Sequence, residues 1–599
     1  MKKLNSYSKK FYMIVLLLSL NGSVTFSQPL FTKITNMTNP VVNDTLESTG
    51  VCWVDFNNDG FLDLFVSNGN VVSQNNSLYL NNQAGGFVKI TTGEIVNDGG
   101  TSIGGTWGDF NNDGNPDLFV TNRNNFGNFL YIGNGDTTFT KVTTGSIVTD
   151  MPNSNSSGWT DVNRDGLVDL FMINFTQNDL LYINNGLPNF TFTKIDTAAF
   201  LNDGGNFSIA GQWADYNNDR FPDCFVGNAG TQNDFVYKNN GNLTFTRTTL
   251  NDARATLGAG WADFNNDGYL DLFTSGYLNQ KSRLYVNGGP PNYDLLPIDT
   301  GIVSNDPANS VGSCWGDFDN DGDLDLFVAN DGTLSGFLYL NSGFPNYAFT
   351  KVTTGTIAGN IANSFGCASG DFNNDGQLDI YVANRLNQKN FLFHNDGNTN
   401  KWITINCIGI SSNKAAIGTK VRVKAVINGN AIWQMQEVTP QSGYNSQNLW
   451  LHFGLGSTAV IDSIKVEWIN GLTHHFTNVR SNEHITISES GNIIGISQNS
   501  SEIPEEFRLF QNYPNPFNPV TKIRFNIPLL RGVSEGRGVF VQLNIYDALG
   551  RKIETIVNSE MKAGSYEASW DGSQFASGIY LYSINAGNYL LTKKMILLK

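Results

Sequence analysis

One acidic nine-residue segment recurs seven times along this chain of 599 residues. The first copy reads DFNNDGFLD, the last reads DFNNDGQLD, and consecutive copies begin 48 to 54 residues apart. Repetition at a period of about 50 residues indicates one structural unit used many times, which constrains the fold more than any single motif can. The copies begin at Asp55, Asp109, Asp161, Asp215, Asp263, Asp317 and Asp371.

Each unit has the same internal order of runs. A Trp precedes the first Asp by two residues in six units, from Trp53 to Trp315, and Ser369 takes its place in the last. The segment is followed by an apolar run such as DLFV, an Asn-rich turn, a second run such as FLYL and a third such as FTKVTTG. Four short strands without sustained helical periodicity are typical of a propeller blade, so we predict an all-β, seven-bladed β-propeller. A seven-unit solenoid is the alternative.

The FTK-type strand indicates how the ring would close. A copy precedes each acidic segment, and the first, FTKIT at Phe31, stands before the first unit. The last unit runs through DIYVAN and NFLFHN and then lacks such a strand. We therefore expect the N-terminal segment to supply the fourth strand of the last blade. That arrangement leaves no open sheet edge, whereas a solenoid would.

The acidic segment places oxygen-bearing side chains at alternating positions. Positions 1, 5 and 9 are Asp in every copy, and position 3 is Asn except for Asp319. With a backbone carbonyl at position 7 and a water, they would provide about six or seven oxygen ligands, a set that favours Ca²⁺. Gly at position 6 permits the positive φ of a sharp turn. The predicted metal ligands are Asp55, Asn57, Asp59, Asp63, Asp109, Asn111, Asp113, Asp117, Asp161, Asn163, Asp165, Asp169, Asp215, Asn217, Asp219, Asp223, Asp263, Asn265, Asp267, Asp271, Asp317, Asp319, Asp321, Asp325, Asp371, Asn373, Asp375 and Asp379.

A simpler interpretation is that Asn, Asp and Gly only form turns. A turn does not require carboxylates at three fixed positions, and crowding them without a cation costs like-charge repulsion. We therefore expect up to seven Ca²⁺ ions, which would nearly balance the formal charge of −16. The loop Asp317–Asp325, acidic at position 3, should bind most tightly. The loop Asp215–Asp223 should be weak or empty, because Arg220 replaces Gly at position 6.

These loops and their apolar flanks resemble FG-GAP or VCBS-type repeats, which occur in integrin α-chain propellers and many bacterial surface proteins. The resemblance covers Phe31 to Asn398. It implies loops that bind calcium between two strands of a blade and are mainly structural, and it implies no particular ligand. We assign the propeller to residues 28–398.

A different pattern follows the propeller. Three segments occur in this order: WITINCIGISSNKAAIGTKVRVKA, SGYNSQ and HFGLG. Their alternating apolar positions predict a small β domain over 399–488. The motifs resemble the ASPIC/UnbV domain, which follows FG-GAP repeats in proteins similar to cartilage acidic protein. No biochemical activity follows from this resemblance.

The chain ends in a third unit. The polar stretch 489–504 is expected to be a linker, and residues 505–599 a C-terminal β-sandwich. This unit contains the segments YPNPFNP from Tyr513 to Pro519, GSYEASWDG, ASGIYLYSINAG and the terminal KKMILLK. Through these segments it resembles a type A C-terminal sorting domain of the type IX secretion system. The resemblance implies contact with that secretion machinery and export across an outer membrane, after which the product is released or attached to the cell surface. An adhesive β-sandwich is the alternative.

The N-terminus has the pattern of a targeting signal. Four lysines between Lys2 and Lys10 precede the apolar run FYMIVLLLSL, and small residues near Ser27 suggest cleavage, so 1–27 is expected to be a signal peptide. The run is short of the roughly 20 residues that a spanning helix needs, and no later run is long enough. We therefore expect an exported protein without a transmembrane anchor.

Charge and cysteine content exclude several classes of partner and site. With 37 Lys plus Arg against 53 Asp plus Glu, the chain lacks the basic footprint that nucleic acid or an anionic membrane requires. The five cysteines have no CxxC spacing, so neither a disulfide framework nor a zinc site is indicated. We interpret most of them as small buried apolar residues: Cys52, Cys224, Cys314, Cys367 and Cys407.

The sequence contains no catalytic constellation. All five histidines lie at or beyond the propeller's end, and a carboxylate committed to calcium is a poor proton shuttle. His474, His475 and His484 could form a metal site, although exposed or structural roles are the simpler interpretation. We therefore predict a secreted or surface-attached binding or adhesion module for a glycan or protein, without enzymatic activity. The alternative is a lyase-like, polysaccharide-active enzyme, which a unique cluster of basic and aromatic residues in the central channel would support.

Overall fold

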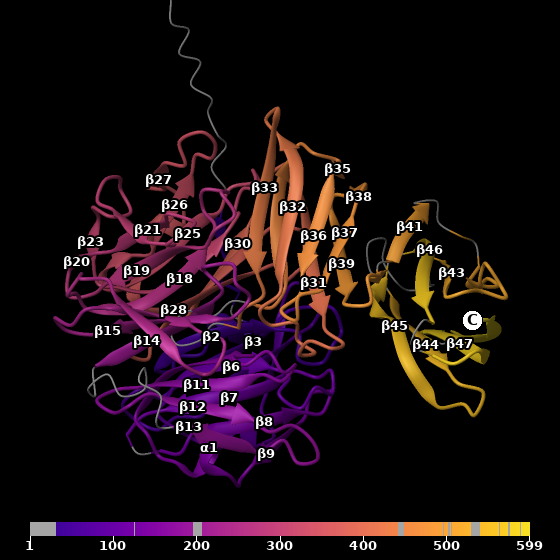
Figure 1. Ribbon diagram of the computed structural model, residues 1–599, viewed down its shortest axis with the longest axis horizontal. Helices are drawn as coiled ribbons and strands as arrows, with labels where there is room; N and C mark the ends of the chain where they lie inside the picture. Colours follow the sequence, from indigo (N-terminus) through magenta and orange to yellow (C-terminus); the bar gives the residue numbers. More distant parts are fainter. Residues whose placement is uncertain are drawn as a thin grey trace, which may run out of the picture.

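The computed structural model describes residues 31–599 apart from 37, 125, 196–206, 441–447, 495, 501–503, 505, 529–538, 562, 573–574 and 588. The expected signal peptide and the SGYNSQ motif lie outside the described residues. Within them, no helix is long and apolar enough to cross a membrane. Strands dominate, and they form a propeller, a middle β domain and a C-terminal β-sandwich in that order along the chain (Figure 1).

Seven four-stranded antiparallel blades make up the propeller within the described residues. Blades 1 to 3 consist of β2 (Ser48–Val54), β3 (Asp63–Asn68), β4 (Ser77–Asn81) and β5 (Phe87–Ile90); β6 (Ser102–Gly108), β7 (Asp117–Asn122), β8 (Phe129–Gly133) and β9 (Phe139–Val142); and β10 (Ser154–Thr160), β11 (Asp169–Asn174), β12 (Leu180–Asn184) and β13 (Phe192–Ile195). Blades 4 to 6 consist of β14 (Ser208–Ala214), β15 (Asp223–Asn228), β16 (Phe235–Asn239) and β17 (Phe245–Thr249); β18 (Thr256–Ala262), β19 (Asp271–Gly276), β21 (Arg283–Asn287) and β22 (Leu295–Ile298); and β24 (Ser310–Gly316), β25 (Asp325–Ser335), β26 (Phe337–Asn341) and β27 (Phe349–Lys351). Blade 7 consists of β28 (Ile361–Gly370), β29 (Asp379–Asn384), β30 (Phe391–Asn395) and β1 (Phe31–Lys33).

Short elements lie between the blades. Two strands, β20 (Gln280–Lys281) and β23 (Pro307–Ala308), pair with each other outside the blade sheets. The long strand β25 also pairs with β28, which joins the sheets of blades 6 and 7. The helical turns are η1 (Pro40–Val42), η2 (Glu94–Val96), α1 (Ser146–Thr149) and η3 (Ile357–Gly359).

The N-terminal strand closes the ring, as the displaced FTK copy predicts. Strand β1 pairs antiparallel with β30 and places Phe31 opposite Asn395. Phe31 is buried against Phe318, with ring centroids 6.1 Å apart, and Lys33 lies over the Phe391 ring at 3.7 Å. The first strands of successive blades contact one another around the circle, and β28 of the last blade returns to β2 of the first. The chain is therefore a closed propeller, and the solenoid alternative is wrong.

The first strands converge on the propeller axis, which explains their small residues. A Cβ added to Gly105 would lie 2.7 Å from a ring carbon of Phe65, so a larger residue does not fit there. Near the start of these strands, apolar side chains from five different blades form one cluster, which places them at the centre of the ring. They are Ile103, Ile209, Leu257, Val311 and Phe365.

The Trp of each unit packs against the neighbouring blade. Trp53 of blade 1 stacks on Phe372 of blade 7 with ring centroids 6.2 Å apart and planes inclined by 7°. Its Nε1 donates a hydrogen bond to the Ala368 carbonyl at 3.3 Å. In blade 7 the Ser369 hydroxyl donates to the Trp315 carbonyl at 3.1 Å. This acceptor is one residue later than the carbonyl that the Trp residues use, so Ser369 keeps a hydrogen bond to the neighbouring blade but neither the ring nor the acceptor of a Trp. Stacks of the same kind join Trp107 to Phe56, Trp159 to Phe110, Trp261 to Tyr216 and Trp315 to Phe264.

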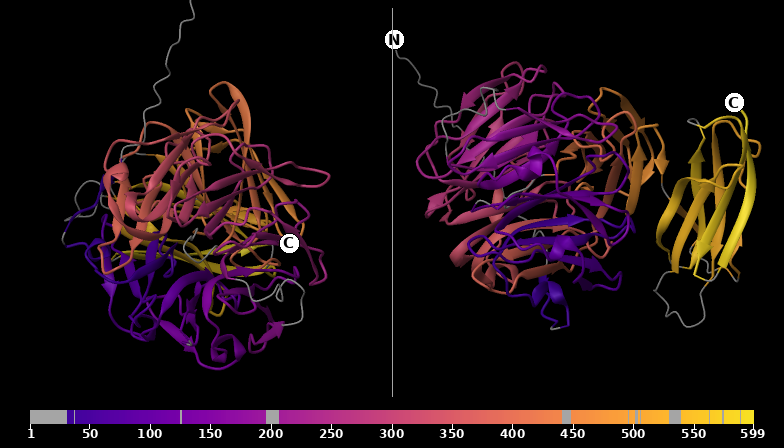
Figure 2. Two further views of the ribbon diagram at one scale, coloured as in Figure 1. Left: turned by 90° about the vertical axis from the view of Figure 1, so that its left-hand side faces the viewer. Right: turned by 90° about the horizontal axis from the view of Figure 1, so that it is seen from below.

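The middle domain is a two-sheet β structure, as expected. One sheet has the order β34 (Leu451–Gly456), β31 (Lys401–Ile408), β39 (Glu483–Ser488), β40 (Ile493–Ile494), and the other β33 (Asn430–Glu437), β32 (Lys420–Ile427), β36 (Ser463–Glu467), β37 (Thr473–Phe476). The short strands β35 (Val460–Ile461) and β38 (Val479–Arg480) pair with each other. The middle domain lies between the propeller and the C-terminal sandwich (Figure 2).

The C-terminal sandwich also has two sheets. They have the orders β41 (Ile496–Ser500), β46 (Gly564–Asp571), β43 (Val520–Ile527), β42 (Arg508–Leu509), and β45 (Lys552–Met561), β44 (Val539–Tyr546), β47 (Gly578–Ala586), β48 (Tyr589–Leu597). Phe517 of the YPNPFNP motif is buried against Trp570 with ring centroids 5.4 Å apart. The stretch 489–504, expected as a linker, contains β40 and β41, so part of it belongs to the sheets on either side.

Candidate metal centres

Each acidic segment forms the loop between the first two strands of its blade. In the first loop, Asp55 accepts hydrogen bonds from the backbone N–H of Asp59 at 2.9 Å and of Gly60 at 2.8 Å, one at each carboxylate oxygen. Asn57 Oδ1 accepts a further bond from the Asp59 N–H at 3.2 Å. The bonds from positions 5 and 6 to the first Asp recur in the other six loops. The seven copies therefore share one backbone geometry, in which the turn wraps around the carboxylate of the first Asp.

The ninth residue of each loop begins the second strand and has no exposed surface. Asp63 accepts hydrogen bonds from the backbone N–H of Phe56 at 3.3 Å and of Asn81 at 2.7 Å. Asp223 Oδ2 and Asp319 Oδ1 are buried and make no hydrogen bond with the described residues. An ionised carboxylate oxygen buried in this way is costly unless something positive lies beside it. The ninth residues are Asp63, Asp117, Asp169, Asp223, Asp271, Asp325 and Asp379.

Burial and mutual repulsion raise the pKa of the loop carboxyl groups. Desolvation, with the charge of Asp59 adding to it, raises the pKa of Asp55 to about 7. Desolvation likewise raises the pKa of Asp263 to about 8. The pKa of Asp63 lies well above its usual value because of burial and the charge of Asp55. A divalent cation among these groups would oppose both effects, because it stabilises the ionised form.

The sixth loop has the densest set of carboxylates. Asp317, Asp319 and Asp325 are buried, and each can offer one oxygen within 4.8 Å of those of the other two. Asp321 at position 5 is buried as well, as is Asp59 in the first loop, whereas the other five counterparts are exposed: Asp113, Asp165, Asp219, Asp267 and Asp375. This loop could hold a cation with four carboxylates and no contact with bulk water at position 5.

Two positions in each loop have positive φ. Gly60 has a φ of 86°, and Arg220, which replaces Gly in the fourth loop, has a φ of 72°. The fourth loop therefore keeps the turn at the cost of a strained side-chain conformation. Position 4 also has positive φ, as in Asn58 with 57° and Arg164 with 62°, and Asn tolerates this region better than most residues.

Position 4 has a role that the sequence analysis missed. Its Asn donates a hydrogen bond from Nδ2 to the position-6 carbonyl of the next loop, as from Asn112 to Gly166 at 2.9 Å and from Asn320 to Gly376 at 2.9 Å. Asn374 donates to Gly60 at 2.8 Å, so these bonds also cross the junction where the ring closes. The signal was present in the sequence, because position 4 is Asn in six copies and Arg164 in the third.

The fourth loop differs from the others in containing a cation from the middle domain. Lys420, the first residue of β32, has a side chain only 6% exposed, and its Nζ lies 2.9 Å from Asp215 Oδ2. The same ammonium donates to the Asp215 carbonyl and to Asn218 Oδ1. Lys238 Nζ lies 3.9 Å from Asp219 Oδ2. The sequence singled out this loop because of Arg220 and had no means of identifying Lys420.

The middle domain covers this end of the propeller, which we call the loop face because it carries the seven acidic loops. His452 Nε2 lies 2.7 Å from Asn320 Oδ1, and the backbone N–H of Lys414 donates to Asn112 Oδ1 at 2.8 Å. Burial lowers the pKa of His452 to about 3, so this histidine is neutral at neutral pH. The domain thus rests directly on the candidate metal loops.

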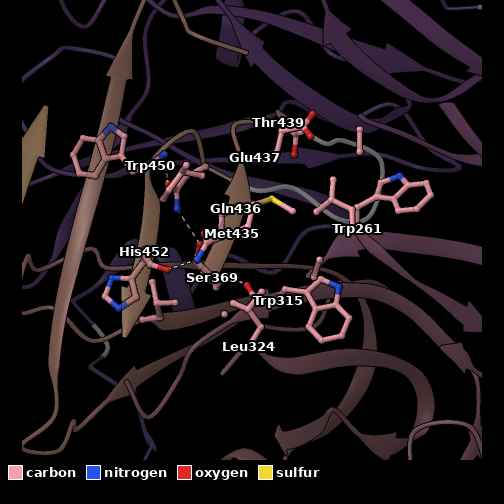
Figure 3. Close-up of a pocket in the computed structure, with 17 residues that line it drawn as sticks. Trp261, Trp315, Leu324, Ser369, Met435, Gln436, Glu437, Thr439, Trp450 and His452 are labelled. Atoms are coloured by element: carbon pink, nitrogen blue, oxygen red, sulfur yellow. Dashed lines mark hydrogen bonds between the residues drawn. The ribbon is translucent and has the colours of Figure 1, made fainter. Parts of the chain in front are cut away.

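A small cavity of about 70 Å³ lies between the loop face and the middle domain (Figure 3). It lies where Ser369 replaces a Trp, and Trp315 and Trp261 line its propeller side. From the middle domain, Trp450 and His452 line it. In blade 7 the space that a Trp ring would occupy is therefore bordered by side chains of the middle domain.

The other candidate sites from the sequence do not assemble. His474 accepts a hydrogen bond from Trp468 Nε1 at 3.0 Å, while His484 packs against Trp402 with ring centroids 4.8 Å apart. Among the described residues, the groups of three or more convergent His, Cys, Asp or Glu include the sixth loop and not these histidines. All five cysteines are buried and free, as interpreted from the sequence.

The opposite end of the propeller, which we call the far face, carries side chains that differ from blade to blade. Six residues beyond the Asp that begins the second strand stand Tyr277 in blade 5, Asp331 in blade 6 and Arg385 in blade 7. Tyr277 donates its hydroxyl to Asp331 Oδ2 at 2.8 Å, and the Arg385 guanidinium lies 3.9 Å from the centre of the Phe365 ring. All three are half-buried. The same position in the other blades holds Gly69, Arg123, Phe175 and Ala229.

Comparison with known families identifies all three parts of the chain. The FG-GAP-like repeat matches residues 55–120, 109–172, 161–226, 215–274 and 317–382, the ASPIC and UnbV family matches 409–493, and the secretion system C-terminal sorting domain matches 511–598. The chain carries these three elements in that order. None of them is a catalytic family. The sorting domain marks the chain for export by type IX secretion, to be secreted or attached to the cell surface.

Comparison with individual proteins adds little. No curated protein matches the chain. A fructofuranosidase variant from Schwanniomyces occidentalis, solved with fructosylnystose, is 10% identical, with 76% of this chain and 86% of that one covered and a TM-score of 0.25. A tetra-tandem repeat from the extending region of a large adhesion protein is 11% identical, with 71% and 96% covered and a TM-score of 0.10. Similarities at these TM-scores support no conclusion.

Proposed function

We propose that the protein is an extracellular binding or adhesion module whose propeller is stabilised by calcium. The observation that supports calcium most directly is the burial of carboxylates in the acidic loops other than the fourth, where the described residues place no lysine or arginine side chain among them. The donor set is all oxygen, which suits Ca²⁺ better than zinc or copper. Asp, Asn, Asp and Asp at positions 1, 3, 5 and 9 would hold the ion, and the ion would screen their repulsion.

Chelation tests the calcium proposal. Each ion adds about 2.7 kcal/mol to the free energy of unfolding when free calcium exceeds Kd about 100-fold, so removing several should lower the Tm by well over about 10 °C. Differential scanning calorimetry of the full chain before chelation, after it and after calcium is restored would measure this. Magnesium serves as the control, because it prefers a smaller, regular octahedral site. An unchanged Tm after chelation contradicts the proposal.

The far face is the surface that we propose for ligand binding. The loop face is occupied by the middle domain, whereas at the far face the same structural position holds Gly, Arg, Phe, Ala, Tyr, Asp and Arg in blades 1 to 7. Aromatic and Arg side chains are enriched where proteins bind partners. Tyr277, Asp331 and Arg385 combine an aromatic surface with hydrogen-bonding groups, a combination that suits a glycan or a polar protein segment.

A glycan array and an extracellular-matrix screen with the full chain test this proposal. Tyr277→Ala should weaken any ligand found by about 2 kcal/mol, which is the loss typical of a central aromatic contact. Tyr269→Ala is the matched control, because Tyr269 lies in the acidic loop of the same blade at the other end. Equal binding by both variants contradicts the far-face assignment.

The same screen distinguishes binding from catalysis. Phe175 and Tyr277 pack against the apolar cluster at the centre of the ring, beside Phe365. Arg385 lies over the Phe365 ring and Arg123 over the Phe175 ring, so basic and aromatic side chains of the kind that the lyase alternative requires do gather there, and the screen has to decide between the two functions. Binding of an acidic or neutral polysaccharide without chain cleavage supports a binding module. Release of shortened polysaccharide chains, measured by size-exclusion chromatography, would contradict the binding module and support the enzyme alternative.

A further inference from the structure

The fourth acidic loop already contains a cation that the protein supplies. Lys420 places its ammonium between the Asp215 carboxylate, the Asp215 carbonyl and the Asn218 side chain. Glu437 of β33 lies beside it, with a carboxylate oxygen 3.8 Å from the ammonium, and accepts the Asp215 N–H at 3.2 Å. The side chains of Lys420, Asp215 and Glu437 are 3–7% exposed. This is a closed ionic group that water hardly reaches.

In the fifth loop a cation of the middle domain, Arg422, lies beside the loop without entering it. Arg422 stands two residues beyond Lys420 on β32, and its Nη1 approaches the Gly268 carbonyl at 3.4 Å. Its Nε is paired with Glu467 at 2.6 Å. The guanidinium thus contacts the outside of the turn, at position 6, while its charge is compensated within the middle domain. Among the described residues, the Asp263 carboxylate of the fifth loop accepts hydrogen bonds only from the backbone N–H of Asp267 and Gly268, the same two loop positions that donate to the first Asp in every copy.

We propose that Lys420 replaces the metal ion in the fourth loop, so that the chain binds six calcium ions and the middle domain supplies the seventh cation. The inference rests on the calcium proposal for the other loops. An ammonium donates hydrogen bonds to oxygen in several directions, as a cation coordinates oxygen, and it carries half the charge of Ca²⁺. Lys238 near Asp219 and Arg220 at position 6 add positive charge that further opposes a divalent ion.

The consequence is that the buried ion pairs at blade 4 contain residues of both domains, Asp215 from the propeller and Lys420 and Glu437 from the middle domain. Asp215 and Lys420 are 205 positions apart in the sequence, so the loop is completed only when the two domains pack together. Calcium therefore stabilises the other blades from solution, whereas blade 4 depends on docking of the middle domain.

The number of bound calcium ions tests this inference. Equilibrium dialysis of the full chain, with calcium counted by atomic emission, should give six ions for each wild-type chain. Asp219→Asn in the fourth loop should leave the number at six. Asp267→Asn is the matched control, because it changes the same position of the fifth loop, and it should lower either the number to five or the affinity of one site at least tenfold.

Removal of the lysine should open the seventh site. Lys420→Met keeps most of the side-chain volume and removes the charge, so the fourth loop should bind one extra calcium ion and the total should rise to seven. Lys424→Met on the same strand is the control, because Lys424 lies over Trp433 at 5.9 Å and should leave the total at six.

The outcomes separate the two proposals. A wild-type chain that binds seven ions and loses one on Asp219→Asn overturns the role of Lys420, as does Lys420→Met with an unchanged total of six. If Lys420→Met does not fold, the calcium counts of Asp219→Asn and Asp267→Asn still show whether the fourth loop binds an ion. A wild-type chain that binds no calcium at all refutes the calcium proposal instead, and the two failures are therefore distinguishable.

Discussion

Trp53 of the first blade packs against the last blade. Replacing it measures how much this contact contributes to the free energy of unfolding of the closed ring. The side chain is 1% exposed, lies flat on Phe372 and donates a hydrogen bond to the Ala368 carbonyl. Burying a Trp removes about 150–250 Å² from water, worth about 4–6 kcal/mol at about 25 cal/mol per Å². Partial collapse of the neighbours recovers some of this. Trp53→Ala should therefore lower the free energy of unfolding by about 3–5 kcal/mol.

Urea unfolding of the full chain in excess calcium, followed by far-UV circular dichroism, measures the change. Trp433→Ala is the matched control, because Trp433 is 39% exposed on β33, and its loss should stay near or below about 0.5 kcal/mol. Equal slopes of the unfolding transitions are needed for the comparison, since a changed slope signals a different unfolded state. A loss below about 1 kcal/mol for Trp53→Ala, or equal losses for the two variants, would refute the stacking argument.

Three further changes test other parts of the propeller. Phe31→Ala removes the buried ring of β1 and should cost about 3 kcal/mol in the same urea assay, and a wild-type midpoint would contradict closure by this strand. Asn374→Ala removes the hydrogen bond to the Gly60 carbonyl and should cost about 1 kcal/mol, whereas no loss would show that the position-4 bonds do not stabilise the ring. Asp319→Asn restores the common residue at position 3 and should weaken the tightest calcium site on the order of tenfold, measured by isothermal titration calorimetry, because one ligand charge is lost. An unchanged titration would mean that the sixth loop is not the tightest site.

The position of the middle domain changes how the acidic loops are understood. In the sequence they differ only at single positions within the loops, but in the structure the sixth loop is buried under β34, and the fourth contains a lysine from β32. Loops enclosed in this way are suited to structural ions and are poorly placed to contact a large ligand. This is why the proposed binding surface lies at the far face, where the side chains differ between blades.

The number of blades, their strand order and the closing strand could all be predicted from the sequence. Each blade repeats the same local pattern, and the displaced FTKIT copy at Phe31 fits one vacancy, the missing fourth strand of the last blade. The backbone geometry of the loops was also predictable, because Asp at position 1 and Gly at position 6 act within five residues of each other. Local hydrogen bonds of this kind depend on sequence spacing alone.

Contacts between distant residues could not be read from the repeat. Lys420 reaches Asp215 across two domains, Asn374 reaches Gly60 across the closed ring, and the middle domain lies beside Ser369. The repeat marks Asn374 as a recurrent residue without naming its acceptor, and nothing near Lys420 or Ser369 in the sequence indicates their partners, because charge compensation and packing depend on which surfaces meet. The seven loops thus share one backbone geometry and, apart from substitutions such as Asp319 and Arg220, one sequence pattern. Their differences in burial and in bound charge come from tertiary structure, because one asymmetric domain packs against a ring of similar units.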